Sequence, residues 1–332
     1  MKIEVGKCLS LSRSDVEKVI TMKRTLEVLD ETFRYIGEGK VVRPFRESLV
    51  MIPSETEKSF ISPHMAWIKP TGALGIKWAG MALRNPSKGL PTGSGVIILN
   101  DVETVMPICI MDAGIITAYR TAGHAGIGAK YLARKDSSVI AIMGCGVQGR
   151  THLMAMNELF KIDEVRIHDI KKEAMDKYSK EMGDKLGLKI TAYETPREAV
   201  KGADVICMCT LERAKPVVMD EWIEPGTHVC GTVAFYDLDA KFSKTADKWA
   251  VAWLPVDVGW IEGEYPWTGK ILKDDIYGDL GEIVTGRKKG RERDDERTLM
   301  THLGMGPLDI APAFDVYKLA KERGLGTILK IF

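Results

Sequence analysis

The stretch from Val139 to Arg150 decides the fold of this chain, and it reads Val-Ile-Ala-Ile-Met-Gly-Cys-Gly-Val-Gln-Gly-Arg. The apolar run predicts a buried strand, and the glycines that follow predict a tight turn into a helix. Gly144, Gly146 and Gly149 have the spacing Gly-x-Gly-x-x-Gly, and Asp169 follows about 20 residues later, at the end of the next apolar stretch. Together these features predict a Rossmann unit that binds a dinucleotide.

Each position in this turn has its own physical role. Gly144 permits the tight strand-to-helix turn, and Gly146 lets main-chain amides approach a pyrophosphate. The helix that begins near Val147 and Gln148 presents its positive end to the phosphate charge. Because the glycine pattern alone is common by chance, a Rossmann-like fold without a cofactor is the alternative, and the flanking strand, helix and acid favour binding.

The acid at Asp169 indicates which dinucleotide is bound. A carboxylate at this place accepts hydrogen bonds from the ribose hydroxyls. Ile170 follows it, so neither arginine nor serine stands there to receive a 2′-phosphate. We therefore expect NAD(H), while Lys171 and Lys172 keep NADP(H) as the alternative.

Length and composition restrict the class of protein. A chain of 332 residues exceeds the usual size of one core, so two domains are expected. A net charge of +1 provides no field for polyanions, and we expect no nucleic-acid partner. No stretch approaches the roughly 20 apolar residues of a membrane helix, and the first residues lack the apolar core of a secretory signal. We expect a cytoplasmic protein that does not bind a membrane.

The cysteines and histidines do not have the spacing of a metal site. Six cysteines are scattered along the chain without a Cys-x-x-Cys pair, and the six histidines show no His-Glu-x-x-His motif. We expect reduced, buried cysteines and no metal.

The first third of the chain predicts an α+β unit. Ser14 to Glu17 has the form of a capping box, which would open a helix that runs to about Tyr35 with apolar residues at Val16, Ile20, Leu26, Leu29 and Phe33. Strand-like segments follow at 48–52, 60–67, 73–81, 95–100 and 105–111. They predict an antiparallel sheet.

The rest of the chain predicts a doubly wound parallel sheet. A long helix at about 112–132 leads to strands near 138–143, 164–168, 188–192, 204–209 and 227–231, which alternate with helices near 148–160, 170–186 and 196–202. The last helix, about 308–323, follows the Rossmann part, and the pattern leaves open which domain it joins. We place residues 1–115 and about 308–332 in an α+β domain for substrate binding and dimerisation, and residues 116–307 in the Rossmann NAD-binding domain.

Further motifs occur in order along the chain. They are Arg43-Pro-Phe-Arg46, Gly75-Ile-Lys77, Gly89-Leu-Pro-Thr92, Ile116-Thr-Ala-Tyr-Arg120-Thr-Ala, Ala129-Lys-Tyr-Leu-Ala-Arg-Lys135, the Gly144 turn, the strand at 227–232 and the segment Gly281–Arg291. Through these motifs the chain resembles the ornithine cyclodeaminase/mu-crystallin family over nearly its whole length. The resemblance implies a two-domain NAD(P)-binding enzyme in which the N-terminal domain pairs two subunits and the active site lies between the domains.

The resemblance also implies residues that hold the substrate. It assigns Arg46, Lys77 and Arg120 to the carboxylate of an amino or imino acid, which guanidinium groups can bind through paired hydrogen bonds. Lys77 lies in an apolar segment, Leu74–Trp78, where burial and neighbouring cations would lower its pKa. We expect it to donate or accept a proton at the substrate nitrogen.

A second set of positions contacts the dinucleotide in relatives. These positions are Thr92, Arg120, Val147, Gln148, Asp169 and Thr210. Thr210 closes a predicted strand, so its hydroxyl would lie at the carboxyl end of the sheet. His64 is a further candidate for the substrate pocket and His302 for the nicotinamide, with a structural role as the alternative for each.

The chain departs from the cyclodeaminases of this family at two carboxylates. Their aspartate, which acts in ammonia release, corresponds to Phe235, and a glutamate before the lysine strand corresponds to Phe60. Asp237, Asp239, Glu55 or Glu57 could substitute for them. Hydride transfer at an α-carbon needs neither carboxylate.

We therefore expect an NAD(H)-dependent oxidoreductase that acts on the C–N bond of a small α-amino acid or cyclic imino acid, and that forms a homodimer. The first alternative is ornithine cyclodeaminase, which forms proline and ammonia with NAD used catalytically. The second is a non-catalytic protein that binds a dinucleotide or a small ligand.

Overall fold

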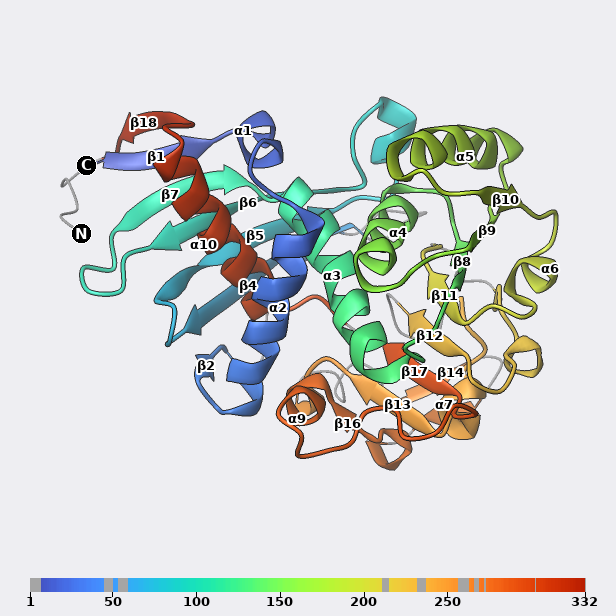
Figure 1. The fold of residues 1–332 in the computed structure, drawn as a ribbon. Helices are drawn as coiled ribbons and strands as arrows, with labels where there is room; N and C mark the ends of the chain where they lie inside the picture. Colours follow the sequence, from blue (N-terminus) through green and yellow to red (C-terminus); the bar gives the residue numbers. More distant parts are fainter. Residues whose placement is uncertain are drawn as a thin grey trace. The chain divides into compact units, whose positions relative to one another are not determined.

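The computed structural model describes residues 7–44, 50–52, 59–210, 215–231, 237–255, 263–265, 269–271, 273–301 and 303–331. The chain divides into two compact units (Figure 1). The first consists of Met1–Arg120 with Gly304–Phe332, and the second of Thr121–Leu303. The last helix of the chain therefore belongs to the first unit.

The first unit is built on a mixed sheet. From one edge to the other its strands are β18 (Thr327–Lys330), β1 (Lys7–Leu11), β7 (Pro107–Asp112), β6 (Gly93–Asn100), β5 (Ala73–Met81), β4 (Ser59–Ile68) and β2 (Val41–Val42), and β3 (Val50–Ile52) also pairs with β4. The prediction of an antiparallel sheet is wrong at one place, because β1 runs parallel to β7. Neither β1 nor β18 was expected, since each is a short segment near an end of the chain without a neighbouring turn signal.

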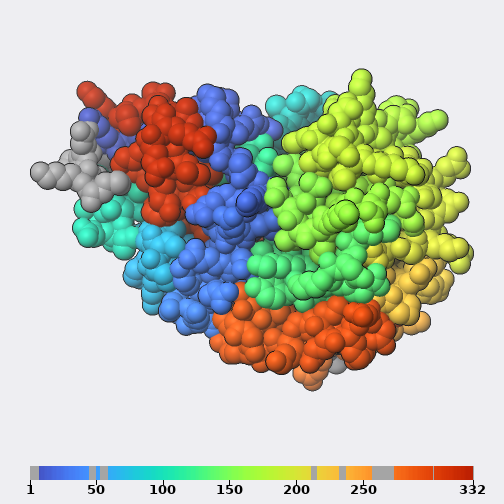
Figure 2. All heavy atoms as spheres, viewed as in Figure 1, coloured from blue at the N-terminus to red at the C-terminus, as the bar shows by residue number. Residues whose placement is uncertain are grey.

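Two helices cover one face of this sheet. They are α2 (Met22–Gly37) and α10 (Gly306–Glu322), which lie side by side in Figure 1. In Figure 2 the blue N-terminal surface and the red C-terminal surface of this unit lie against each other, as the pairing of β1 with β18 requires. The five apolar residues expected on the first helical segment are all buried.

That first helical segment is two helices, which corrects the prediction of one. Ser12, and not Ser14, caps α1 (Arg13–Glu17): its hydroxyl accepts from the amide of Asp15, whose carboxylate accepts from the amide of Ser12. Thr21 then caps α2 by accepting from the amide of Arg24 at 3.2 Å. A second N-cap separates the helices because its hydroxyl replaces the missing main-chain partner.

The second unit contains a parallel sheet. Its strands in spatial order are β10 (Ile190–Ala192), β9 (Glu164–His168), β8 (Val139–Met143), β11 (Val205–Met208), β12 (His228–Gly231), β17 (Thr298–Thr301), β13 (Lys248–Val251) and β16 (Gly278–Asp279). The five predicted strands are confirmed, and β17, β13 and β16 extend the sheet. These three were missed because they are two to four residues long and do not alternate regularly with helices.

Both faces of the parallel sheet are buried, which confirms the doubly wound fold. Ile140 and Ile142 pack in a core with α3 (Gly114–Leu132), α4 (Val147–Leu159) and α5 (Lys172–Leu186). Ala141 and Met143 alternate with them and pack in a second core with α6 (Pro196–Val200) and α7 (Phe242–Thr245).

The described residues also form η1 (Asn85–Lys88), η2 (Asp220–Trp222), η3 (Lys273–Asp275), α9 (Leu280–Val284) and a hairpin of β14 (Gly263–Tyr265) and β15 (Gly269–Ile271).

The strand order of this sheet reverses between β8 and β11. The chain first adds β9 and β10 on one side of β8, and then adds β11 and β12 on the other. In open α/β sheets such a switch point forms a crevice at the carboxyl ends of the strands, where ligands bind. The glycine turn after β8 and Thr210 after β11 both lie at this end.

Candidate functional site

One candidate site, in the second unit, is the turn after β8. Gly144 has φ of +102°, and a Cβ there would lie 2.6 Å from the carbonyl oxygen of Cys209. Its amide donates to the carbonyl of His168 at 2.8 Å. Only glycine combines this backbone conformation with so close an approach of β8, β9 and β11.

The other two glycines of the turn differ in their surroundings. A Cβ on Gly149 would overlap the carbonyl oxygen of Gly144, so this position allows α4 to pack directly on the turn. A Cβ on Gly146 would meet no atom within 4 Å. The space at Gly146 lies at the N-terminus of α4. The amides of the first turn of a helix have no hydrogen-bond acceptor within that helix, so they can bind an anion.

Asp169 is fixed beside this turn at the end of β9. Its carboxylate accepts from the amide of Cys145 at 2.8 Å and from the amide of Lys171 at 3.0 Å. Each oxygen retains a lone pair for a ribose hydroxyl. Ile170, the next residue, is 91% exposed. The open backbone at Gly146, the N-terminus of α4 and the anchored carboxylate together fit an NAD-type dinucleotide.

Thr210 and Asp237 lie on the same end of the sheet. The Thr210 hydroxyl donates to a carboxylate oxygen of Asp237 at 2.7 Å, and Asp237 is buried. Asp239 accepts from the amides of Asp220 and Lys241. Both candidate substitutes for the cyclodeaminase carboxylate are therefore engaged by this chain's own groups, while Glu55, Glu57 and Phe235 lie outside the described residues.

Another candidate site lies in the first unit. His64 on β4 and Lys77 on β5 are direct cross-strand partners. The first turn of α10 packs against this hairpin so closely that a Cβ on Gly306 would overlap the carbonyl of Met65. This contact brings Asp309, in the same helical turn, to the two strand residues.

The cluster centres on the carboxylate of Asp309. One oxygen lies 2.8 Å from Nζ of Lys77, and the other accepts from Nε of Arg120 at 2.9 Å. Nδ1 of His64 is 3.6 Å from the oxygen that faces Lys77. Lys77 is 2% exposed, Arg120 is 6% exposed and Asp309 is fully buried. Charged groups this deep are retained only when they are paired.

Burial and charge determine which of these groups are ionised. Burial by itself would raise the pKa of Asp309, but Arg120 and Lys77 outweigh it and hold that pKa below its ordinary value. Burial, together with the charge of Lys77, lowers the pKa of His64 to about 3. The histidine is therefore neutral near pH 7. In the cluster the cations Lys77 and Arg120 outnumber the carboxylate of Asp309, and Arg43 adds positive charge near His64.

The terminal nitrogens of Arg120 lie against the main chain at Gly304. A Cβ on Gly304 would come within 2.9 Å of Nη2 and 3.4 Å of Nη1. The missing side chain at Gly304 thus leaves room for the guanidinium fork, the part of an arginine that binds a carboxylate through paired hydrogen bonds.

The structure brings together Lys77, Arg120 and His64, which were expected near the substrate. Arg46 and His302 lie outside the described residues. Thr92 precedes β6, and its carbonyl accepts from the amide of Ala82 at 2.9 Å. Val147, the first residue of α4, is exposed, and Gln148 follows it.

Asp309 is the residue that the sequence reasoning missed. It is the one charged residue in the apolar stretch Met305–Phe314, and a lone acid in such a stretch signals a buried partner. The expectation for Lys77 considered only burial and neighbouring cations. The carboxylate of Asp309 acts in the opposite direction, because it favours the ammonium form.

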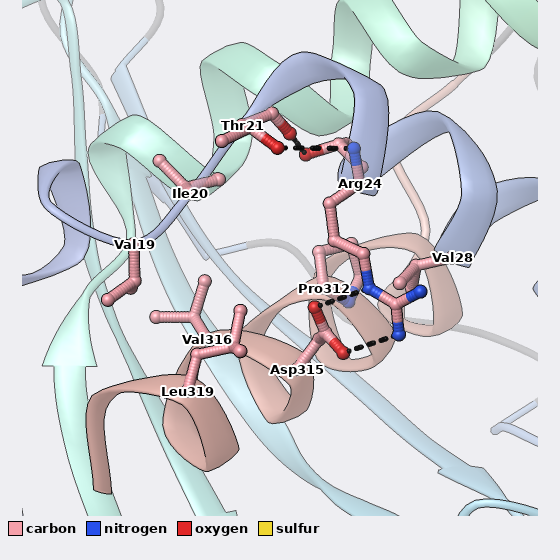
Figure 3. Close-up of a pocket in the computed structure, with 10 residues that line it drawn as sticks. Val19, Ile20, Thr21, Arg24, Val28, Pro312, Asp315, Val316 and Leu319 are labelled. Atoms are coloured by element: carbon pink, nitrogen blue, oxygen red, sulfur yellow. Dashed lines mark hydrogen bonds and ion pairs between the residues drawn. The ribbon is translucent and has the colours of Figure 1, made fainter. Parts of the chain in front are cut away.

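A separate small cavity lies between the α1–α2 connection and α10 (Figure 3). Its walls are mostly apolar, and its polar side is the pair of Arg24 and Asp315, in which the guanidinium donates to both carboxylate oxygens at 3.1 and 2.9 Å. It has room for about one water molecule, too little for an amino acid.

Two further findings concern the described part of the chain. It contains no helix long and apolar enough to cross a membrane. Within the same residues, no three histidine, cysteine, aspartate or glutamate side chains are arranged to hold a metal ion.

The fold and the two candidate sites define a Rossmann-type α/β protein with a second, α+β unit that carries a buried cationic cluster. The chain belongs to the ornithine cyclodeaminase/mu-crystallin family, whose model matches residues 7–324.

Three relatives are similar over almost the whole chain. Alanine dehydrogenase from Archaeoglobus fulgidus is 34% identical over 98% of both chains. The structure of Thermococcus litoralis Δ1-pyrroline-2-carboxylate reductase with NADH and L-proline has a TM-score of 0.87 at 34% identity, over 96% of this chain and 99% of that one. An archaeal alanine dehydrogenase dimer with bound NAD has a TM-score of 0.86 at 33% identity, over 98% of this chain and 100% of that one.

Proposed function

We propose that this protein is an NAD(H)-dependent oxidoreductase that acts on the C–N bond of a small α-amino acid or cyclic imino acid. The observation that carries the proposal is the buried cluster of Lys77, Arg120 and Asp309, in which the cations outnumber the anion. A substrate carboxylate supplies the opposite charge. The similarity to an alanine dehydrogenase and a pyrroline-2-carboxylate reductase, each at 34% identity, supports the same class of reaction.

The residues of the first unit bind the acid and move the proton. The guanidinium fork of Arg120 binds the substrate carboxylate, and the Lys77 ammonium donates a proton to the imine nitrogen. In the opposite direction Lys77 takes that proton from the amine. A bound nicotinamide supplies or accepts the hydride at the α-carbon. One hydride and one proton are thus added to the C=N bond, which balances the reduction to an amine.

The residues of the second unit would hold the dinucleotide. The first-turn amides of α4 bind the pyrophosphate, and the open backbone at Gly146 permits its approach. The carboxylate of Asp169 accepts from the ribose hydroxyls and repels a 2′-phosphate. We therefore propose NAD(H) as the preferred cofactor. The relatives with bound NADH and NAD support this choice.

We further propose that the protein is a homodimer joined through the first unit. The sheet face opposite α2 and α10 carries exposed apolar side chains on adjacent strands: Met65, Trp78 and Val96, of which Trp78 and Val96 are cross-strand partners. Such a patch is typical of a protein interface. The dimeric archaeal alanine dehydrogenase supports a second copy as its partner. We also propose a cytoplasmic location, which the six free cysteines support.

A spectrophotometric assay tests the function. The purified protein is incubated with NADH and either Δ1-pyrroline-2-carboxylate or pyruvate plus ammonia or methylamine. The expected result is oxidation of NADH that depends on the acid, with a slower reaction when NADPH is supplied. If NADH absorbance stays constant across the panel, the oxidoreductase proposal is wrong.

Ornithine cyclodeaminase is the second candidate, and the family name is what favours it. The engagement of Asp237 with Thr210 weighs against it. Formation of proline and ammonia from ornithine, with NAD at less than one equivalent and no net NADH, would establish it in place of the first candidate. NAD(H) binding without turnover in either assay would instead indicate a non-catalytic binding protein.

A further inference from the structure

We propose that Asp309 is a positioning residue of the candidate site, whose carboxylate sets the places of the Lys77 ammonium and the Arg120 guanidinium. The inference rests on the proposed function and deepens it. It concerns a residue on α10, a helix to which the sequence motifs assign no role.

The geometry shows that one carboxylate organises two cations from different elements. Lys77 comes from β5 and Arg120 from α3, and each bonds a different oxygen of Asp309, at 2.8 and 2.9 Å. The single carboxyl group of Asp309 therefore holds Nζ of Lys77 and Nε of Arg120 at a set separation. Because Asp309 is fully buried, water does not compete for either bond.

The pairing also leaves the guanidinium fork of Arg120 directed away from Asp309. Arg120 uses Nε for Asp309, while Nη1 and Nη2 lie against Gly304. The Lys77 ammonium forms an ion pair with the other oxygen of the same carboxylate. A second carboxylate, that of the substrate, can then be bound by the fork of Arg120.

The charge balance gives Asp309 a second effect. With His64 neutral, removal of the carboxylate would leave Lys77 and Arg120 as buried cations without the anion that each contacts, and Arg43 adds positive charge near His64. The repulsion and the cost of burial would favour loss of the proton from Lys77, since Arg120 stays protonated. A neutral Lys77 cannot donate a proton to an imine.

The same helix provides a matched control. Asp315 is also a buried carboxylate of α10 and is bound by Arg24 through two hydrogen bonds, beside the small cavity of Figure 3. Asp309→Asn and Asp315→Asn each remove one charge from the same helix. Only Asp309 contacts the cluster, so a loss of function that merely reflects weakened packing of α10 would occur in both variants.

The experiment compares Asp309→Asn, Asp315→Asn and wild type in imine reduction at saturating NADH. For Asp309→Asn we expect kcat/KM for the imino acid to fall about 100-fold. We also expect the rate of this variant to begin to fall at a pH about one unit lower than in wild type. Rate should recover in part at lower pH, where Lys77 is protonated again. Asp315→Asn should keep both the rate and the pH profile. An unchanged rate and profile in Asp309→Asn, or equal changes in both variants, would overturn the inference.

Two additions keep the outcome decisive. Affinity for NADH, measured by fluorescence, shows that each variant is folded. If Asp309→Asn does not fold, Asp309→Glu retains the charge but displaces it, and we expect kcat to fall about 10-fold with an unchanged pH profile. An unchanged kcat in that variant overturns the proposal.

Failure of the proposed function itself is recognised separately. If wild type reduces no imino acid, binding of L-alanine and L-proline to the protein with NAD is measured by calorimetry. We then expect Asp309→Asn, and not Asp315→Asn, to weaken binding at least about 10-fold. Equal affinity in both variants, or no binding by wild type, overturns the role of Asp309 as well.

Discussion

Lys77 is a buried ammonium that lies 2.8 Å from the carboxylate of Asp309. A lysine on a β-strand is ordinarily a solvated side chain. The apolar residues around Lys77 in the sequence do not by themselves show whether it is solvated or buried. The carboxylate of Asp309, which lies against it, stabilises its charge in the interior. The residue therefore combines two properties that a proton donor needs, namely exclusion of water and a fixed position.

The first prediction concerns Lys77. Lys77→Ala removes the proposed proton donor and should lower kcat at least about 100-fold, while the affinity for NADH changes little. Steady-state rates and NADH fluorescence titration measure the two effects. Lys69→Ala, which changes an exposed lysine just after β4, is the control and should retain full rate. Full rate in Lys77→Ala would exclude the proton-transfer role.

The second prediction concerns Asp169. Asp169→Ala removes the acceptor of the ribose hydroxyls and should weaken NADH binding about 10- to 100-fold, with a smaller effect on NADPH. Comparison of the two dissociation constants measures the change in preference. Asp163→Ala, at the opposite end of β9, should alter neither constant. If the ratio of the two constants stays the same in Asp169→Ala, this carboxylate does not select the cofactor.

At the scale of single elements, the turn between β8 and α4 requires glycine at three positions of one motif, and the physical requirement differs at each. Gly144 needs its positive φ, Gly149 needs to lack a Cβ because the Gly144 carbonyl lies there, and Gly146 has free space around it. Glycine at positions 144 and 149 is needed for the fold. Glycine at position 146 leaves space for the ligand.

The third prediction separates these requirements. Gly149→Ala should destabilise the protein by about 1–3 kcal/mol, because the new Cβ forces α4 away from the turn. Gly146→Ala should leave the stability unchanged within about 0.5 kcal/mol and still weaken NADH binding, because the methyl group occupies the approach to the pyrophosphate. Urea unfolding and NADH titration distinguish the two variants. Equal stability of both variants would contradict the packing argument.

Helix boundaries show where local sequence signals compete. Ser12 and Ser14 both precede an acid three residues later, and the sequence pattern does not rank the two boxes. The structure uses Ser12, and Thr21 begins a new helix.

The strands of the second unit were easier to predict where apolar runs alternate with helices than in the short strands β13, β16 and β17.

At the scale of the whole molecule, buried neutral histidines link stability to pH. His152 and His228 are fully buried in the second unit. Burial lowers the pKa of His152 to about 4, and burial with the nearby charge of Arg291 lowers the pKa of His228 to about 3. The unfolded chain binds these protons near pH 6.5, whereas the folded protein does not.

The fourth prediction follows from this difference. The free energy of unfolding should be at its full value above about pH 7, and fall by about 1.4 kcal/mol per pH unit for each histidine as the pH decreases from about 6.5 to about 4. Urea unfolding at about pH 7.5 and about pH 5 measures the slope. His152→Gln removes one titrating group and should reduce the slope accordingly. Equal unfolding free energies at both pH values would show that these histidines do not titrate as described.

The sequence by itself determined the Rossmann unit, its glycine turn, the acid at Asp169 and the family. These features are local, because strand periodicity, turn conformation and helix start depend on residues that are close together in the chain. Only the tertiary structure decided that Asp309 joins Lys77 and Arg120. Asp309 is 189 residues from Arg120, and its position depends on α10 returning to the first unit and packing against β4. The lone acid in an apolar stretch is a local signal of a buried partner, but it does not identify that partner, because the energy of a buried ion cluster depends on residues that the fold brings together.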